Sequence, residues 1–135
     1  MGRYLAGYAV VLLVVLVLDV LWIGFIAKPL YAAGIGHLMA ERPNLAAAAA
    51  FYLVYPLGLM AFAVLPAGMP VEWGRTLASA ALFGFIAYAT YDLTNLATLR
   101  DWPVGLALLD MAWGTGISVA ASAAGKAALA RLFAA

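Results

Sequence analysis

The apolar run YLAGYAVVLLVVLVLDVLWIGFIA, residues 4–27, decides the fold, because Asp19 is its only charged residue. A helix needs roughly 20 apolar residues to cross the hydrocarbon core of a bilayer, and this run is long enough. Lys28 and Pro29 end it, since proline cannot continue a helix interior. The run is too long for the core of a secretory signal peptide, and no small-x-small cleavage site follows it. We therefore expect a retained transmembrane helix over residues 4–27.

Three further apolar segments are predicted to cross the bilayer: residues 44–65, 76–98 and 103–125. The connections between the segments are short, so neighbouring helices must be antiparallel. In the first connection, residues 30–40 are expected to form a short interfacial helix with Tyr31 and His37 near the headgroups. Small residues recur at four-residue spacing on the last segment, which favours close helix packing: Gly114, Ser118 and Ser122. The prediction is an all-α, integral membrane up-down four-helix bundle that forms one domain over residues 1–135.

The composition agrees with a membrane protein and excludes several other classes. Of the 135 residues, 68% are hydrophobic and 10% are charged, too few charges to cover the surface of a soluble domain of this size. The chain has no cysteine, which excludes disulfides and thiolate catalysis. A net charge of +1 gives no nucleic-acid footprint. One histidine alone cannot form a metal centre, so we expect no metal and no cofactor.

Half of the acidic residues lie inside predicted spans, at one shared depth. Antiparallel threading places Asp19, Asp92 and Asp110 roughly 9 to 12 Å inside the same membrane face. An ionised carboxylate that faces lipid costs about 2.5 to 3.5 kcal/mol, so these side chains should point into the bundle. Packed together without cations they would repel, and we expect one or more of them to hold a proton.

Aromatic and polar residues accompany these aspartates at helical spacing. Trp22 and Trp113 each lie one turn beyond an aspartate, and Tyr52 and Tyr55 begin the second span on the same side of the membrane. The predicted ligand-binding residues are Asp19, Trp22, Tyr88, Tyr91, Asp92, Asn95, Asp110 and Trp113. The basic residues near this face are expected to extend charge inward: Lys28, Arg42 and Arg100. A structural polar clamp that only locks the helices together is the alternative interpretation.

Three strings give the chain a resemblance to a known family. They are Asp19-Val20-Leu21-Trp22, the octapeptide YDLTNLAT at residues 91–98, and DMAWGT at residues 110–115. With them the chain resembles, over nearly its whole length, the bacterial domain-of-unknown-function family DUF2177 of small membrane proteins. The resemblance implies a four-helix layout and brings no activity with it.

Three classes of function fit these residues. The leading hypothesis is an accessory membrane module that binds a small amphipathic molecule, a lipid or a cation between aromatic walls. The alternatives are a structural subunit of a larger membrane complex or homo-oligomer, and a membrane enzyme that uses paired carboxylates on a lipid-like substrate. Whether the protein is an enzyme stays open. The expected partners are membrane lipids, an amphipathic ligand and a membrane complex or second copy, with no nucleic acid.

The basic residues also predict location and orientation. We expect the cell inner membrane. On the face of the termini lie Arg3, Arg75, Lys126 and Arg131, and on the other face lie Lys28, Arg42 and Arg100. This excess predicts cytoplasmic termini by the positive-inside rule.

Overall fold

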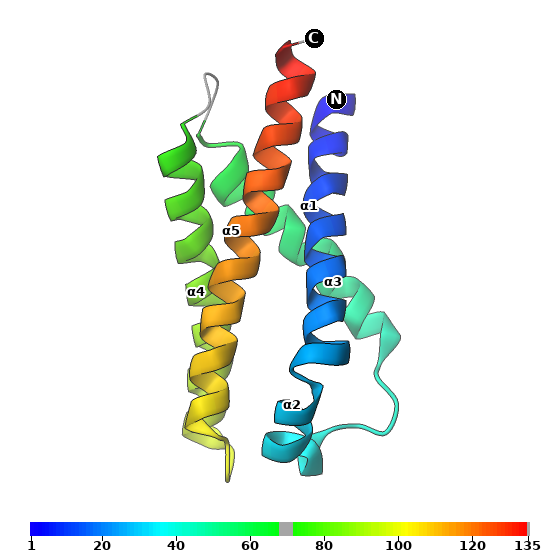
Figure 1. Ribbon diagram of the computed structural model, residues 1–135, viewed down its shortest axis with the longest axis vertical. Coiled ribbons are helices and arrows are strands. Elements are labelled where there is room, and N and C mark those ends of the chain that lie inside the picture. Colours follow the sequence, from blue (N-terminus) through cyan, green and yellow to red (C-terminus); the bar gives the residue numbers. More distant parts are fainter. Residues whose placement is uncertain (68–71, 135) are drawn as a thin grey trace.

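The computed structural model describes residues 1–67 and 72–134, and it is a bundle of long helices (Figure 1). In chain order the elements are α1 (Gly2–Leu21), the π-helical turn η1 (Trp22–Ile26), α2 (Lys28–Ile35), the 3-10 turn η2 (Gly36–Leu38), α3 (Leu45–Leu59), the π-helical turn η3 (Met60–Val64), α4 (Trp73–Thr98) and α5 (Val104–Ala134). No strand occurs within these described residues. Both termini lie at one end of the bundle, and α2 lies at the other (Figure 1). The all-α prediction is confirmed.

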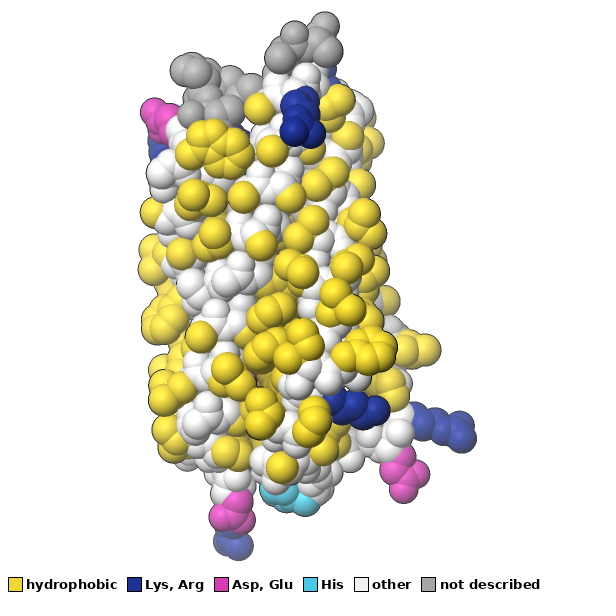
Figure 2. Space-filling view, in the orientation of Figure 1, with side chains coloured by type: hydrophobic (Ala, Val, Ile, Leu, Met, Phe, Trp, Pro, Cys, Tyr) yellow, Lys and Arg dark blue, Asp and Glu magenta, His cyan; other side chains and the backbone are white. Residues whose placement is uncertain are grey.

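Four helical segments are long and apolar enough to cross a membrane: Gly2–Ile26, Leu45–Val64, Trp73–Thr98 and Val104–Leu132. Hydrophobic side chains cover the flanks of the molecule, while charged side chains gather at its two ends (Figure 2). Large apolar residues in the middle of the helices, such as Leu13 and Leu82, are exposed. Such a surface matches the hydrocarbon core of a bilayer rather than water. The protein is a membrane helical bundle.

The helices agree with the predicted spans except at the ends of the first, second and last spans. The first and second spans end in the π-helical turns η1 and η3, which the sequence did not predict. The last helix continues to Ala134, well beyond the predicted end at residue 125. The short helix α2 begins at Lys28, two residues before the predicted interfacial segment, and ends inside that segment. Between the second and third predicted spans lies the connection of residues 66–75, of which positions 68–71 lie outside the described residues.

Close packing between α5 and its neighbours holds the bundle together. The contact between α4 and α5 is the most extensive, followed by that between α1 and α5. At the first contact Gly84 lies so close to the Gly114 carbonyl and to Ser118 that a side chain at position 84 would overlap them. Small residues let membrane helices approach this closely.

Buried residues recur every four positions on these three helices. On α1 the stripe is Gly7, Val11, Val15 and Asp19. On α4 the stripe includes Gly84 and Asp92. On α5 it includes Asp110 and Ser118. Positions four apart share one face of a helix, so each aspartate lies on the same stripe as the residues that make the helix contacts. The sequence therefore turns the aspartates inward through the same pattern that packs the helices.

The helix α3 is tilted against the others (Figure 1). Its first turn is capped by Asn44, whose Oδ1 accepts hydrogen bonds from the Ala46 and Ala47 amides at 3.1 Å. Pro56 lies inside α3 and removes one backbone donor, as membrane helices tolerate. The far end of this segment, η3, packs on α4, whereas α3 itself makes little contact with α4. The two helices therefore diverge toward the end of the bundle that holds the aspartates.

The connections at that end fix the depth of the aspartates. A tight turn joins α4 to α5, and Asp101 in this turn has a positive φ of 58°. The short helix α2 folds back onto η1 and the start of α5, where Gly34 faces Pro103 and Leu106. This return brings side chains of α2 over the interior of the bundle.

The predicted end of the last span at residue 125 implies that Lys126 enters the headgroups, but the structure buries this side chain. Its side chain is 2% exposed, and its Nζ donates a hydrogen bond to the Val64 carbonyl at 3.0 Å. The prediction was wrong because α5 continues past this residue and η3 ends beside it, which offers the ammonium group a carbonyl inside the bundle.

Candidate intramembrane binding site

The three intramembrane aspartates lie in the interior of the bundle. Asp19 on α1 is 3% exposed, Asp92 on α4 is fully buried, and Asp110 on α5 is 7% exposed. Each therefore needs polar partners from the protein, because lipid supplies none.

Asp19 joins three helices through two hydrogen bonds. The Tyr52 hydroxyl on α3 donates to Oδ2 at 2.7 Å, and the Trp113 indole N–H on α5 donates to Oδ1 at 3.2 Å. Trp22, in η1, stacks on Trp113 with ring centroids 4.4 Å apart and planes 7° from parallel. The π-helical turn thus places one tryptophan directly against the tryptophan that binds Asp19. Such turns occur often at functional sites.

Asp110 receives a hydrogen bond from α2. The Tyr31 hydroxyl donates to Asp110 Oδ1. Burial raises the pKa of the Tyr31 hydroxyl, and the hydrogen bond and charge of Asp110 raise it further. The hydroxyl therefore keeps its proton at neutral pH and stays a donor. The sequence placed Tyr31 near the headgroups, but the return of α2 turns its side chain inward.

Asp92 on α4 lies next to Asp110 on α5. The two carboxyl groups are close enough to interact directly, and the Trp102 indole lies near Asp92. Neither Asp92 oxygen nor the Trp102 indole N–H has a hydrogen-bond partner of normal geometry among the described residues. Asp92 therefore offers unfilled hydrogen-bond acceptors in the interior of the bundle.

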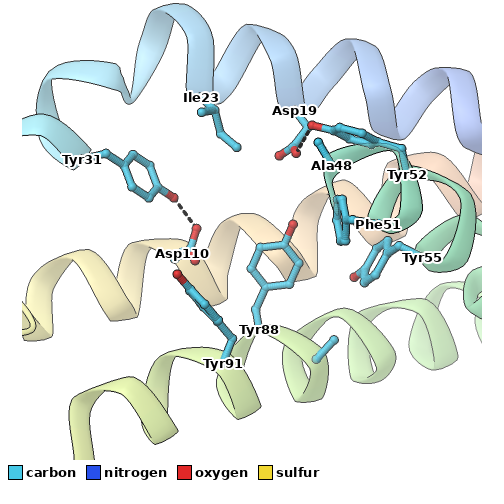
Figure 3. A pocket seen from close by; sticks show the side chains of 11 residues that line it. Asp19, Ile23, Tyr31, Ala48, Phe51, Tyr52, Tyr55, Tyr88, Tyr91 and Asp110 are labelled. Atoms are coloured by element: carbon cyan, nitrogen blue, oxygen red, sulfur yellow. Dashed lines mark hydrogen bonds between the residues drawn. The ribbon is translucent and has the colours of Figure 1, made fainter. Parts of the chain in front are cut away.

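A cavity of about 530 Å³ lies between Asp19, Asp110 and the tyrosines of α2, α3 and α4 (Figure 3). Its polar groups are two carboxyls and five tyrosine hydroxyls, and apolar side chains form the rest of its wall. The lining residues are Asp19, Ile23, Tyr31, Ala48, Phe51, Tyr52, Tyr55, Ala87, Tyr88, Tyr91 and Asp110. The side chains of Tyr88 and Tyr91 rise from α4 toward the opposite helices (Figure 3). Cavities of this size, with apolar walls and a few polar groups, are typical of small-molecule sites.

The predicted site residues divide into two groups. Asp19, Tyr88, Tyr91 and Asp110 line the cavity. The other four lie outside its lining: Trp22 and Trp113 form the stacked pair, Asp92 lies behind Asp110, and Asn95 lies half-buried near Tyr91.

Several lining residues were absent from the predicted set. The sequence places Tyr52 and Tyr55 on the same side of the membrane as the aspartates. Their three-residue spacing indicates that they share one face of α3. Phe51 and Ala48 extend the same face of α3. For Tyr31 the sequence held no comparable signal, because only the return of α2 brings it to Asp110.

The basic residues near this face do not reach the aspartates, contrary to the expectation from their long stems. Lys28, Arg42 and Arg100 are exposed. Among the described residues the one salt bridge runs between Arg75 and Glu72 at the other end of the bundle, at 4.0 Å. No lysine, arginine or histidine lines the cavity. In the same described ranges, no three His, Cys, Asp or Glu side chains are grouped so that they could hold a metal ion.

The fold and this cavity define a class: a small membrane helical bundle with a buried acidic site walled by tyrosines. Residues 4–127 match the model of the family described as "Predicted membrane protein (DUF2177)", and the chain belongs to this family. The family resemblance of the three sequence strings is thereby confirmed. No curated protein and no solved structure matches the chain.

Proposed function

We propose that this protein binds a small, membrane-soluble amphipathic molecule, with the polar end of the molecule between Asp19 and Asp110. The observation that carries the proposal is the cavity of about 530 Å³ between α1, α3, α4 and α5. It combines aromatic walls with a few converging polar groups, which is the usual composition of a ligand site. A purely structural clamp would be expected to fill this space with side chains, because protein interiors are close-packed.

The route to the cavity supports a ligand that arrives from the bilayer. Three lining residues on the lipid-facing side are partly exposed: Ile23, Phe51 and Tyr91. They come from η1, α3 and α4, and α3 diverges from α4 at this end of the bundle. A molecule dissolved in the hydrocarbon region can therefore reach the carboxyl groups without passing through water.

The test is native mass spectrometry of the protein purified in nanodiscs from its own membranes. We expect the wild-type chain to retain a small molecule, and Asp110→Asn and Ala48→Phe to lose it. Ala48 lines the cavity, so a phenylalanine there fills it. Ala49→Phe is the matched control, since Ala49 is exposed and lines no cavity among those described. An empty wild-type protein, or equal retention by Ala48→Phe and Ala49→Phe, contradicts the proposal.

We further propose that the protein resides in the cell inner membrane with cytoplasmic termini. The support for this orientation is the positive-inside rule. Toward the face of the termini lie Arg3, Arg75, Lys126 and Arg131, and toward the other face lie Lys28, Arg42 and Arg100. Lys126 contributes to this excess from a buried position. The roles of membrane enzyme and of structural subunit remain predictions from the sequence.

A further inference from the structure

A second cavity, of about 500 Å³, lies between α3, η3 and α4. Its lining residues are Phe51, Val54, Tyr55, Leu57, Gly58, Ala61, Phe62 and Phe83. Tyr55 is the one polar residue in this set, and its hydroxyl is hydrogen-bonded to Ser118 at 2.7 Å. Phe62 and Phe83 stack at the far end with ring centroids 5.8 Å apart. The wall of this cavity therefore offers a ligand almost only apolar surface.

The two cavities are neighbours, because Phe51 and Tyr55 line both. Between Phe51 and Phe62 the chain of α3 and η3 advances roughly 16 Å along its own axis. The second cavity thus continues from the acidic layer toward the end of the molecule that holds the termini. The second cavity, here called the α3–α4 groove, is apolar along its length and adjoins the acidic cavity at Phe51 and Tyr55.

The carboxyl groups of the first cavity determine which ligand charge is favourable there. Two carboxyl groups face the first cavity, a third lies behind Asp110, and no basic side chain lines it. A phosphate or carboxylate headgroup would meet like charge, which costs several kcal/mol in a buried interface. A cationic head would instead supply the counter-charge that buried carboxylates require.

The depth of the aspartates in the membrane limits which polar head a ligand can carry. The aspartates lie roughly 9 to 12 Å inside the membrane boundary, below the level of ordinary headgroups. Any charged head must shed water to reach this level, so the site has to replace the hydrogen bonds that the head loses. A primary ammonium is small, and tyrosine hydroxyls beside it can accept its remaining hydrogen bonds.

From these steps we infer that the ligand is a single-chain amine, with its ammonium group between Asp19 and Asp110 and its alkyl chain along the α3–α4 groove. The inference rests on the proposed function, because it names the ligand class for the same site. It adds a tail site and a direction, with the chain pointing from the acidic layer toward the face of the termini.

Photocrosslinking of the full chain in nanodiscs tests this inference. The probes are two dodecylamines, one with a diazirine beside the amine and one with a diazirine at the last carbon. We expect the head probe to label peptides containing Tyr52 or Tyr88, and the tail probe to label those containing Phe62 or Phe83. Mass spectrometry of the digested protein locates the adducts.

Two comparisons make the result specific. Ala61 is exposed and lines only the second cavity, so Ala61→Phe should lower tail labelling severalfold and leave head labelling in place. Ala49→Phe should match the wild type in both. Tail-labelled dodecanol and dodecanoic acid test the head, and we expect each to label Phe62 and Phe83 severalfold less than the amine.

The outcomes separate the inference from the proposed function. Head labelling at Tyr52 or Tyr88 without tail labelling at Phe62 or Phe83 overturns the tail site and leaves the proposed function standing. Equal labelling by dodecanol or dodecanoic acid overturns the choice of an amine. A protein that retains a native molecule yet gives no labelling with either amine probe also overturns the inference. A wild-type protein that is empty in native mass spectrometry overturns the proposed function itself.

Discussion

Lys126 on α5 stabilises the end of the neighbouring helical segment η3. Its stem is buried between helices, and its ammonium group binds the Val64 carbonyl at the end of η3. The last carbonyl groups of a helix have no partner within the helix, and a cation near them is favoured by the helix dipole. The lysine therefore supplies a cap to the segment that carries Tyr52 and Tyr55.

Replacing this lysine with methionine keeps an unbranched buried chain and removes the cap. We expect Lys126→Met to lower the free energy of unfolding by about 1.5 to 3 kcal/mol, the range for a hydrogen bond to a charged group. Lys28→Met is the control, since Lys28 is exposed. Denaturation in mixed detergent micelles measures both variants. Equal stability of the two variants would show that Lys126 does not cap the helix.

At this scale the sequence predicted some residues correctly and others not. The burial of Asp19, Asp92 and Asp110 followed from the cost of a carboxylate in lipid, which holds wherever the neighbouring helices lie. The positions of Tyr31 and Lys126 depended on how far neighbouring segments extend and where they turn back. Helical periodicity does not contain that information.

Among the elements, α4 and α5 form the main contact of the bundle, and glycines make it possible. Gly114 on α5 lies against the ring of Tyr88, so any side chain at position 114 would overlap that ring. Gly116, two residues further, has no atom within 4 Å of where a Cβ would stand. The two glycines on one helix therefore have different roles, one at a contact and one in the lipid-facing surface.

This difference gives a matched pair of variants. Gly114→Leu should cost about 1 to 3 kcal/mol through overpacking, and it should also displace Tyr88 from the wall of the cavity. Gly116→Leu should leave both stability and ligand retention unchanged. Unfolding in detergent and native mass spectrometry measure the two effects. A Gly114→Leu protein as stable as Gly116→Leu would contradict the close contact between the helices.

The number and kind of elements were predictable, and their irregularities were not. Four apolar runs of the right length define four spans. The regular spacing of Gly114, Ser118 and Ser122 correctly indicated close packing of α5. The tilt of α3 and the burial of Lys126 on α5 depend on how the helices pack against one another. An apolar run has the same composition whether it stands straight or tilted.

For the molecule as a whole, antiparallel threading determines which end carries the acidic site. The segments before α2 and between α4 and α5 meet at the end opposite the termini (Figure 1). Two separate facts were needed to predict this: the direction of each span and the distance of each aspartate from its end. Both can be read from the sequence, whereas the side of the membrane to which that end belongs is predicted only from a small excess of basic residues.

Cysteine labelling decides the orientation cleanly, because the chain has no cysteine of its own. With cytoplasmic termini, a membrane-impermeant maleimide should label Glu41→Cys in intact cells and should leave Gly2→Cys unlabelled until the cells are lysed. Both positions are exposed, and they lie at opposite ends of the bundle. The reverse pattern of labelling would place the termini outside.

The divergence of α3 from α4 has a consequence for exchange with the surrounding bilayer. The most extensive contacts join α5 to α1 and α4, whereas the exposed lining residues Phe51 and Tyr91 lie on α3 and α4, whose mutual contact is slight. For the proposed function we therefore expect a ligand to enter and leave sideways from the bilayer while α1, α4 and α5 stay packed together. Exchange would then require movement of α3 alone and no partial unfolding.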